Sequence, residues 1–160
     1  YLGLSYPGGP VIEKEAKDGD PMAFNLPIAM KDSPFDFSFS GLKTATMDCI
    51  QRCKNPQDRI ADLCASFQHA AFQALLLKTR NACEQASIRT LIVGGGVAAN
   101  QTLMQLFTQF SHDTGVKLIP IDKTLCTDNA VMIGLAAIHL GHCYDTLSPI
   151  TAKASLSYER

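Results

Sequence analysis

The amino-acid sequence predicts an α/β fold that is rich in helix and contains a small parallel sheet. Two short apolar runs, 88–93 and 116–121, are typical of strands, and the amphipathic segment 99–113 between them predicts a helical crossover. A crossover of this kind joins parallel, right-handed neighbours. A parallel sheet of two strands cannot cover its own faces, so either the domain is mainly helical or further strands lie outside this sequence.

The first half of the chain begins with a short helix and an irregular connection. The helix is expected over 11–17, after the turn PGGP, and Gly19 is expected to end it at the usual C-terminal position of a glycine. Residues 18–37 contain three prolines and predict a packed but irregular connection. A serine cap then predicts a second helix that continues through Cys53.

A long helix follows the pair Asn55–Pro56, which is typical of a cap and a first helical turn, and continues to about Ala86. Its apolar residues keep the three-and-four spacing of one buried face. These residues are Ile60, Leu63, Phe67, Ala70, Ala71, Ala74 and Leu75.

The second half of the chain is expected to alternate strand and helix. The strand Ile88 to Val93 reads as buried, and Gly115 is expected to close the helix 99–113. The last main helix is expected to begin at Thr127 or Asp128 and to end before residue 141.

The composition excludes several function classes. Lys plus Arg is 14 and Asp plus Glu is 15, so no global field attracts nucleic acid, and any RNA contact must be local or made by a partner. No apolar run approaches the roughly 20 residues of a membrane span, and the first residues do not resemble a signal peptide. None of the six cysteines forms CxxC, which predicts reduced thiols in the cytoplasm.

Two motifs carry chemistry. A glycine triplet follows the first expected strand in LIVGGGVAAN, residues 91–100, and CTDNA at 126–130 precedes the last helix. A strand, a glycine turn and a helix start bring the backbone close to a phosphate, although glycines also make ordinary tight turns. Together the two motifs predict a nucleotide-binding lobe with an acidic ligand nearby.

Five motifs occur in a fixed order. They are YPGGP at 6–10, FSFSGLKTA at 37–45, ASFQ at 65–68, GGVAAN at 95–100 and CTDNA at 126–130. Over residues 1–141 they resemble the carboxy-terminal half of the TsaD family, formerly named O-sialoglycoprotein endopeptidase or glycoprotease. The resemblance implies a partial lobe of the actin/sugar kinase/Hsp70-like (ASKHA, ribonuclease-H-like) fold, with 142–160 as a tail.

The resemblance also implies a function. Members of the family transfer a threonylcarbamoyl group from threonylcarbamoyl-AMP to the adenosine adjacent to the anticodon of tRNA. The implied partners are tRNA and TsaB-like and TsaE-like subunits in the cytoplasm, with no membrane. The implied nucleotide ligand is threonylcarbamoyl-AMP or ATP.

The resemblance assigns nucleotide contacts to Gly9, Glu13, Gly95, Gly96 and Asn100. The glycines would let the backbone approach the nucleotide, Glu13 would accept from ribose hydroxyls, and the amide of Asn100 suits a ribose or an adenine edge. From the residues alone, the glycines are explained by a tight turn, Glu13 by a solvated charge on a helix, and Asn100 by a helix cap. No catalytic side chain is assigned.

Asp128 matches the metal-binding aspartate of the family, with Thr127 and Asn129 expected to support it; without the resemblance it is an ordinary first-turn acid. The implied ion is divalent, iron or zinc, and its other ligands are two histidines spaced HxxxH, which this sequence does not contain. His139 and His142 are spaced HxxH and are expected at the surface or at a helix end.

Two further expectations follow. Lys43 is the best local candidate for a phosphate or RNA contact, and a plain exposed lysine is the alternative. The glycine-rich loop of the VSGGHT type is also absent, so we expect a fragment with half of the cleft, inactive alone, whose uncovered sheet edge favours self-association.

Two other function classes remain open. A metallo-glycoprotease needs a metal-held water and a general base, and this sequence offers one matched ligand and no HExxH. A noncatalytic ASKHA-like partner subunit is not expected to keep both Asp128 and Asn100.

Overall fold

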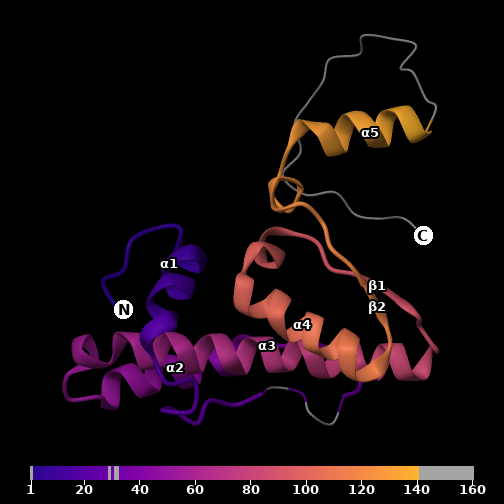
Figure 1. The fold of residues 1–160 in the computed structure, drawn as a ribbon. Helices are drawn as coiled ribbons and strands as arrows, with labels where there is room; N and C mark the ends of the chain where they lie inside the picture. Colours follow the sequence, from indigo (N-terminus) through magenta and orange to yellow (C-terminus); the bar gives the residue numbers. More distant parts are fainter. Residues whose placement is uncertain (1, 29, 31–32, 141–160) are drawn as a thin grey trace. The chain divides into compact units, whose positions relative to one another are not determined.

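A computed structural model of the chain describes residues 2–28, 30 and 33–140 (Figure 1). The chain divides into two compact units, Tyr1–Thr127 and Asp128–Arg160. The expected tail, 142–160, lies outside the described residues, so the predicted boundary at residue 141 stays a prediction.

The described residues form helices and two strands in the predicted order. The α-helices are α1 (Gly8–Glu15), α2 (Ser40–Arg52), α3 (Ile60–Gln85), α4 (Gln101–Thr114) and α5 (Ala130–Leu140). The strands β1 (Thr90–Ile92) and β2 (Lys117–Ile119) pair in parallel, with Leu91 opposite Leu118. Short 3-10 turns occupy 16–18, 56–59, 96–99 and 123–125. The prediction of a helix-rich fold with a small parallel sheet is therefore confirmed.

Helix α3 is the centre of the first unit, and α1, α2 and α4 all pack on it (Figure 1). The seven apolar residues expected on the buried face are all buried or half-buried, but the burial extends beyond one face, because the consecutive residues 63–66 are all buried. Successive helical residues point about 100° apart. Four buried residues in a row therefore require neighbours on every side of this part of the helix.

The sheet differs from the prediction in its burial. Leu91, Val93 and Leu118 pack against a core of α3 and α4 residues that includes Phe107. The opposite face is open, because Ile92 is 60% exposed. The expectation of a buried strand was wrong: the apolar run matches a strand covered on both faces, and the described residues cover only one.

Three helix starts also differ from the predictions. No side chain caps α2, whose first turn closes through the Lys43 N–H and the Phe39 carbonyl. Asn55 precedes a 3-10 turn and makes no side-chain cap. Helix α5 begins at Ala130, because Asn129 Oδ1 accepts from the Met132 N–H at 3.0 Å and so occupies the N-cap position.

Gly19 has a different role from the one predicted. Its φ of −104° is extended backbone, whereas Gly115 has the left-handed φ of +73° expected after a helix. A Cβ on Gly19 would lie 2.1 Å from the Ala61 carbonyl oxygen. The glycine is needed because the chain crosses α3 too closely for any side chain.

Three polar side chains of α3 are buried and paired. Ser66 Oγ accepts from the Phe24 N–H at 3.1 Å, and Gln68 Oε1 accepts from the Asn100 amide at 2.9 Å. Lys78 Nζ, on a residue only 2% exposed, donates to two backbone carbonyls of the connection before α2. Burial of such groups is costly unless they are paired, so each bond fixes the segment that supplies the partner.

Five cysteines are free in the described residues, and burial raises the pKa of the Cys64 and Cys83 thiols. Contrary to the composition argument, the stretch 56–85 is long and apolar enough to cross a membrane, but 44% of its apolar window is buried inside the protein. The core helix of a folded unit passes the same test.

Gly19→Ala should lower the free energy of unfolding by about 1–3 kcal/mol, because the added methyl group displaces the backbone from α3. Urea denaturation monitored by circular dichroism measures the effect. Gly41→Ala is the matched control, since a Cβ at Gly41 in α2 meets no atom within 4 Å. Equal stability of the two variants would contradict the close approach at Gly19.

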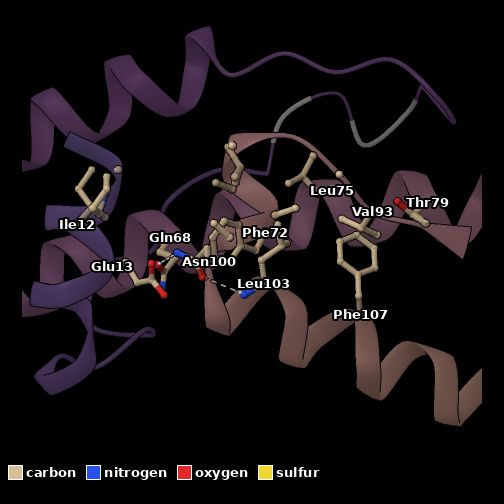
Figure 2. Close-up of a pocket in the computed structure, with 18 of the residues that line it drawn as sticks. Ile12, Glu13, Gln68, Phe72, Leu75, Thr79, Val93, Asn100, Leu103 and Phe107 are labelled. Atoms are coloured by element: carbon tan, nitrogen blue, oxygen red, sulfur yellow. Dashed lines mark hydrogen bonds between the residues drawn. The ribbon is translucent and has the colours of Figure 1, made fainter. Parts of the chain in front are cut away.

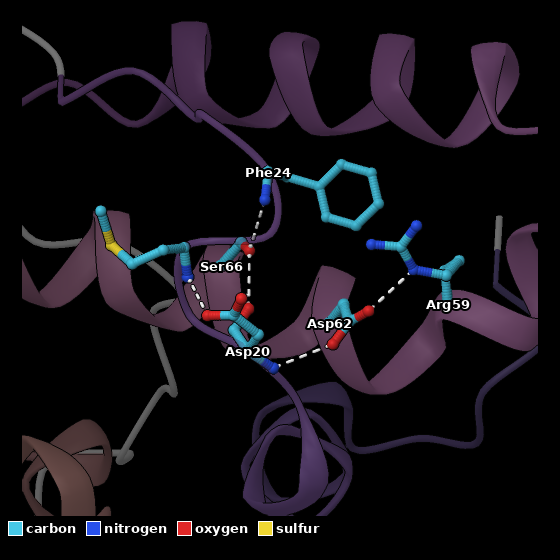
Figure 3. Close-up of polar contacts among 6 residues, drawn as sticks. Asp20, Phe24, Arg59, Asp62 and Ser66 are labelled. Atoms are coloured by element: carbon cyan, nitrogen blue, oxygen red, sulfur yellow. Dashed lines mark hydrogen bonds and ion pairs between the residues drawn. The ribbon is translucent and has the colours of Figure 1, made fainter.

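Asp62 gives the first unit an acid-sensitive contact (Figure 3). Its carboxylate accepts from the Asp20 N–H at 2.9 Å and from Arg59 Nε at 2.7 Å. The backbone bond from Asp20, followed by the bond from Arg59, lowers the pKa of this carboxyl. A lowered pKa means that the stabilisation is present above the unfolded pKa and is lost as the pH falls through the folded pKa.

Asp62→Asn should therefore destabilise the protein at neutral pH, and the difference from wild type should shrink as the pH falls through the lowered pKa of the wild-type carboxyl. Thermal unfolding over a pH series measures the difference. Asp48→Asn, which removes an exposed charge from α2, should show no such convergence. A constant difference between wild type and Asp62→Asn at all pH values would contradict the assignment.

Candidate functional site

A cavity of about 780 Å³ lies in the first unit, between α1, α3, β1 and the start of α4. Figure 2 shows two ends: Glu13, Gln68 and Asn100 gather at a polar end, whereas Thr79, Val93 and Phe107 lie at the other. Most of the lining is apolar. A cleft of this size with a few convergent polar groups is typical of a small-molecule site.

Four of the five predicted nucleotide residues line this cavity: Gly9, Glu13, Gly96 and Asn100. They come from two segments almost ninety positions apart, since a bond between Glu13 and Gln101 spans 88 residues of sequence. The fifth, Gly95, lies between two glycines that do line it. The structure therefore brings four of the predicted residues together at one cavity.

The glycine turn has a backbone requirement at one position. Gly95 has φ +91°, a conformation that side chains rarely adopt. Gly96 has no such constraint, and a Cβ there would meet no protein atom within 4 Å. A 3-10 turn, Gly96–Ala99, begins at the last glycine of the triplet and precedes α4, so the glycines do not form the start of this helix.

Two of the first three amides of α4, those of Gln101 and Leu103, are paired with side chains. Asn100 Oδ1 accepts from the Leu103 N–H at 3.1 Å, which confirms the helix-cap interpretation. Glu13 Oε1 accepts from the Gln101 N–H at 2.8 Å. A carboxylate at the positive end of the helix occupies the place that a phosphate would otherwise take. This end of the cavity therefore suits hydroxyl and amine groups better than an anion.

Both side chains keep further bonding capacity. A carboxylate has a second oxygen, and an amide has two N–H groups and two lone pairs, of which Asn100 uses one each in the bonds described. A ribose hydroxyl or an adenine edge can therefore bind without breaking the helix cap. The cap and the ligand roles are compatible in this geometry.

Sequence reasoning missed Gln68 and the aromatic part of the lining. Gln68 is 8% exposed, and its side-chain carbonyl oxygen accepts a hydrogen bond from the Asn100 amide. It belongs to the ASFQ motif, whose residues have no role assigned from the sequence. Phe39 from FSFSGLK also lines the cavity. Lys43 from the same motif lies instead at a separate, smaller cavity beside Thr46 and Met47.

Asp128 belongs to the second unit and is exposed there, directly before the Asn129 cap of α5. Contrary to the prediction, it is not the first residue of the helix. Within residues 2–28, 30 and 33–140, no three His, Cys, Asp or Glu side chains are grouped to hold a metal ion. His139 lies in α5 and His142 lies outside the described residues. An exposed carboxylate fits one ligand position of a divalent ion, but the described residues do not complete a site.

Comparison with known proteins gives one consistent result. The family model described as "TsaD: tRNA N6-adenosine threonylcarbamoyltransferase" matches residues 1–135. Curated relatives with that enzyme name include a protein of Symbiobacterium thermophilum, 47% identical over 141 residues, which covers 87% of this chain and 41% of the relative.

Two further relatives carry the same name. One from Prochlorococcus marinus strain AS9601 is 47% identical over 147 residues, with 86% of this chain and 41% of the relative covered. One from Thermosynechococcus vestitus is 42% identical over 165 residues, with 98% and 47% covered. The chain thus spans less than half the length of these relatives. Its match to the family model extends over most of its own length, and the chain belongs to the TsaD family.

Proposed function

We propose that this chain forms one side of the nucleotide site in a tRNA N6-adenosine threonylcarbamoyltransferase. The reaction transfers threonylcarbamoyl from threonylcarbamoyl-AMP to the adenosine adjacent to the anticodon, and AMP leaves. The observation that carries the proposal is the meeting of Gly9, Glu13, Gly96 and Asn100 at one cavity, within a family of this activity.

The chain's own residues act here by binding and orienting. Glu13 and Asn100 hold the ribose or an adenine edge through the bonding capacity that the α4 cap leaves free. The apolar end, with Leu75, Val93 and Phe107, shields the ligand from water. Holding the adenylate in one orientation lowers the entropic part of the barrier to transfer.

We also propose the fold, the location, the partners and the metal ion that the family resemblance implies. The fold would be one lobe of the ASKHA type, acting in the cytoplasm with tRNA and with TsaB-like and TsaE-like subunits. A divalent ion, iron or zinc, would be held in part by Asp128 and would polarise an oxygen of the substrate. Both strands have an outer edge without a strand partner in the described residues, which supports self-association of this chain.

The alternatives have less support. A metallo-glycoprotease needs a metal-held water, and the described residues contain no group of three ligands that would hold the ion. A noncatalytic partner subunit is disfavoured by the family match, because the matching model describes the transferase.

A chimera tests the proposed activity. It joins the part of the Symbiobacterium thermophilum relative that the alignment leaves uncovered to this chain. With partner subunits, threonylcarbamoyl-AMP and unmodified tRNA, it should form threonylcarbamoyladenosine, measured by mass spectrometry of digested tRNA. In this chimera, Asn100→Ala should reduce transfer. A folded chimera that binds no adenylate and modifies no tRNA would overturn the proposal.

The two roles of Asn100, as the cap of α4 and as a contact to the nucleotide, can be tested separately. Asn100→Ser keeps a capping oxygen for α4 but removes the amide that donates to buried Gln68 Oε1, so the variant should fold with a free energy of unfolding lower by about 1–3 kcal/mol. Binding of ATP to the 160-residue chain should weaken by about 1–3 kcal/mol, or roughly 5- to 150-fold, in calorimetry. Unchanged ATP affinity in the folded variant would reduce Asn100 to a helix cap.

Asp128→Ala in the chimera should lower bound metal and transfer together, because the ion loses an anionic ligand. Elemental analysis of the purified protein measures the metal. Asp48→Ala is the control for the loss of an exposed carboxylate. Full metal content in Asp128→Ala would remove this residue from the ligand set.

A further inference from the structure

An aromatic pair begins at the candidate cavity and continues beyond it. Phe39 lines the cavity, and Phe37 stacks with Phe39 at 6.4 Å between ring centroids and 14° between ring planes. Phe37 is 50% exposed and Phe39 is 42% exposed. Half-exposed rings leave aromatic surface open to solvent, and nucleobases stack on such surfaces.

The segment that carries the pair is held on both sides. Before it, Lys78 and Asn81 of α3 donate to backbone carbonyls; their acceptors are Met30, Ser33 and Pro34. After it, the Lys43 N–H donates to the Phe39 carbonyl at 2.9 Å, where α2 begins. Because the backbone that carries the rings is already held in place, stacking of a base on them requires little further loss of conformational entropy.

The charge of the chain favours a base over the RNA backbone as the occupant. The formal net charge is −1, so phosphate attraction over the whole surface cannot supply the affinity for RNA. Single-stranded loops of RNA are recognised through unstacked bases on aromatic side chains. An acceptor base must also approach the cavity in which the adenylate is proposed to lie, and Phe39 lines that cavity.

We infer that Phe37 and Phe39 form a stacking platform for a base of the anticodon loop of the substrate RNA, beside the adenylate cavity. The inference rests on the proposed function for its substrate class. It adds a recognition surface for the acceptor RNA. Lys43, one helical turn beyond Phe39, is exposed but lines a separate cavity, so the two rings alone define the platform.

The test uses the 160-residue chain and a short anticodon stem-loop RNA with 2-aminopurine at the position beside the anticodon. Stacking on an aromatic ring quenches the fluorescence of this base. Wild-type protein should quench it on binding. Phe37→Leu keeps an apolar side chain but removes the ring, so it should lose most of the quenching and weaken RNA binding about fivefold or more.

Two variants control the experiment. Phe37→Tyr keeps the ring and should restore the quenching. Phe35→Leu should behave as wild type, because Phe35 is 42% exposed but lies outside the stacked pair. Circular dichroism establishes that each variant is folded.

Three outcomes would overturn the inference: no quenching by wild-type protein, unchanged quenching by Phe37→Leu, or an equal loss in Phe35→Leu. Loss of TsaB-like subunit binding in Phe37→Leu with RNA quenching intact would assign the pair to a protein interface instead. The measurement needs no transfer reaction. Quenching with an inactive chimera would therefore count against the proposed function and leave the platform in place.

Discussion

The burial of three polar side chains on α3 determines how the first unit is arranged. Ser66, Gln68 and Lys78 lie at 1%, 8% and 2% exposure, and each bonds to a segment far away in sequence. An unpaired polar group inside a protein costs free energy, so each segment is stable only where it supplies the partner. Apolar contacts pack the other helices against α3, and the hydrogen bonds of these three side chains fix where the neighbouring segments lie.

The bond from Gln68 has the largest consequence for the candidate site. It links α3 to Asn100, whose own carbonyl oxygen caps α4, while Glu13 of α1 binds the adjacent Gln101 amide. Three helices therefore meet at the start of α4 through side chains that also face the cavity. A ligand that bonds to Glu13 and Asn100 would find them already oriented, which is how a site lowers the entropic cost of binding.

Local sequence patterns predicted much of this fold. The periodicity placed the helices and both strands within a few residues, and the crossover predicted their parallel pairing. The same patterns failed where the cause is distant in sequence. Gln68 and Lys78 are polar residues that the sequence alone would place on the solvent-facing side of a helix. Their burial could not be predicted locally, because their hydrogen-bond partners lie 32 and 48 residues away. Gly19 resembled a helix end, yet its reason is the α3 backbone at Ala61.

The residues of the candidate site were predicted from the family resemblance and not from local sequence patterns. Gly9, Glu13 and Asn100 have ordinary structural explanations in isolation, and only the family resemblance connected them before the structure placed them at one cavity. The aromatic pair had no such signal, because Phe35, Phe37 and Phe39 alternate with the period of a strand, yet no strand forms there in the described residues. Its position follows from Lys78, which fixes the start of that connection, and from α2, which fixes its end. The two proposed recognition surfaces therefore depend on the same helix, since buried polar groups of α3 orient both Asn100 and the segment that leads to Phe37.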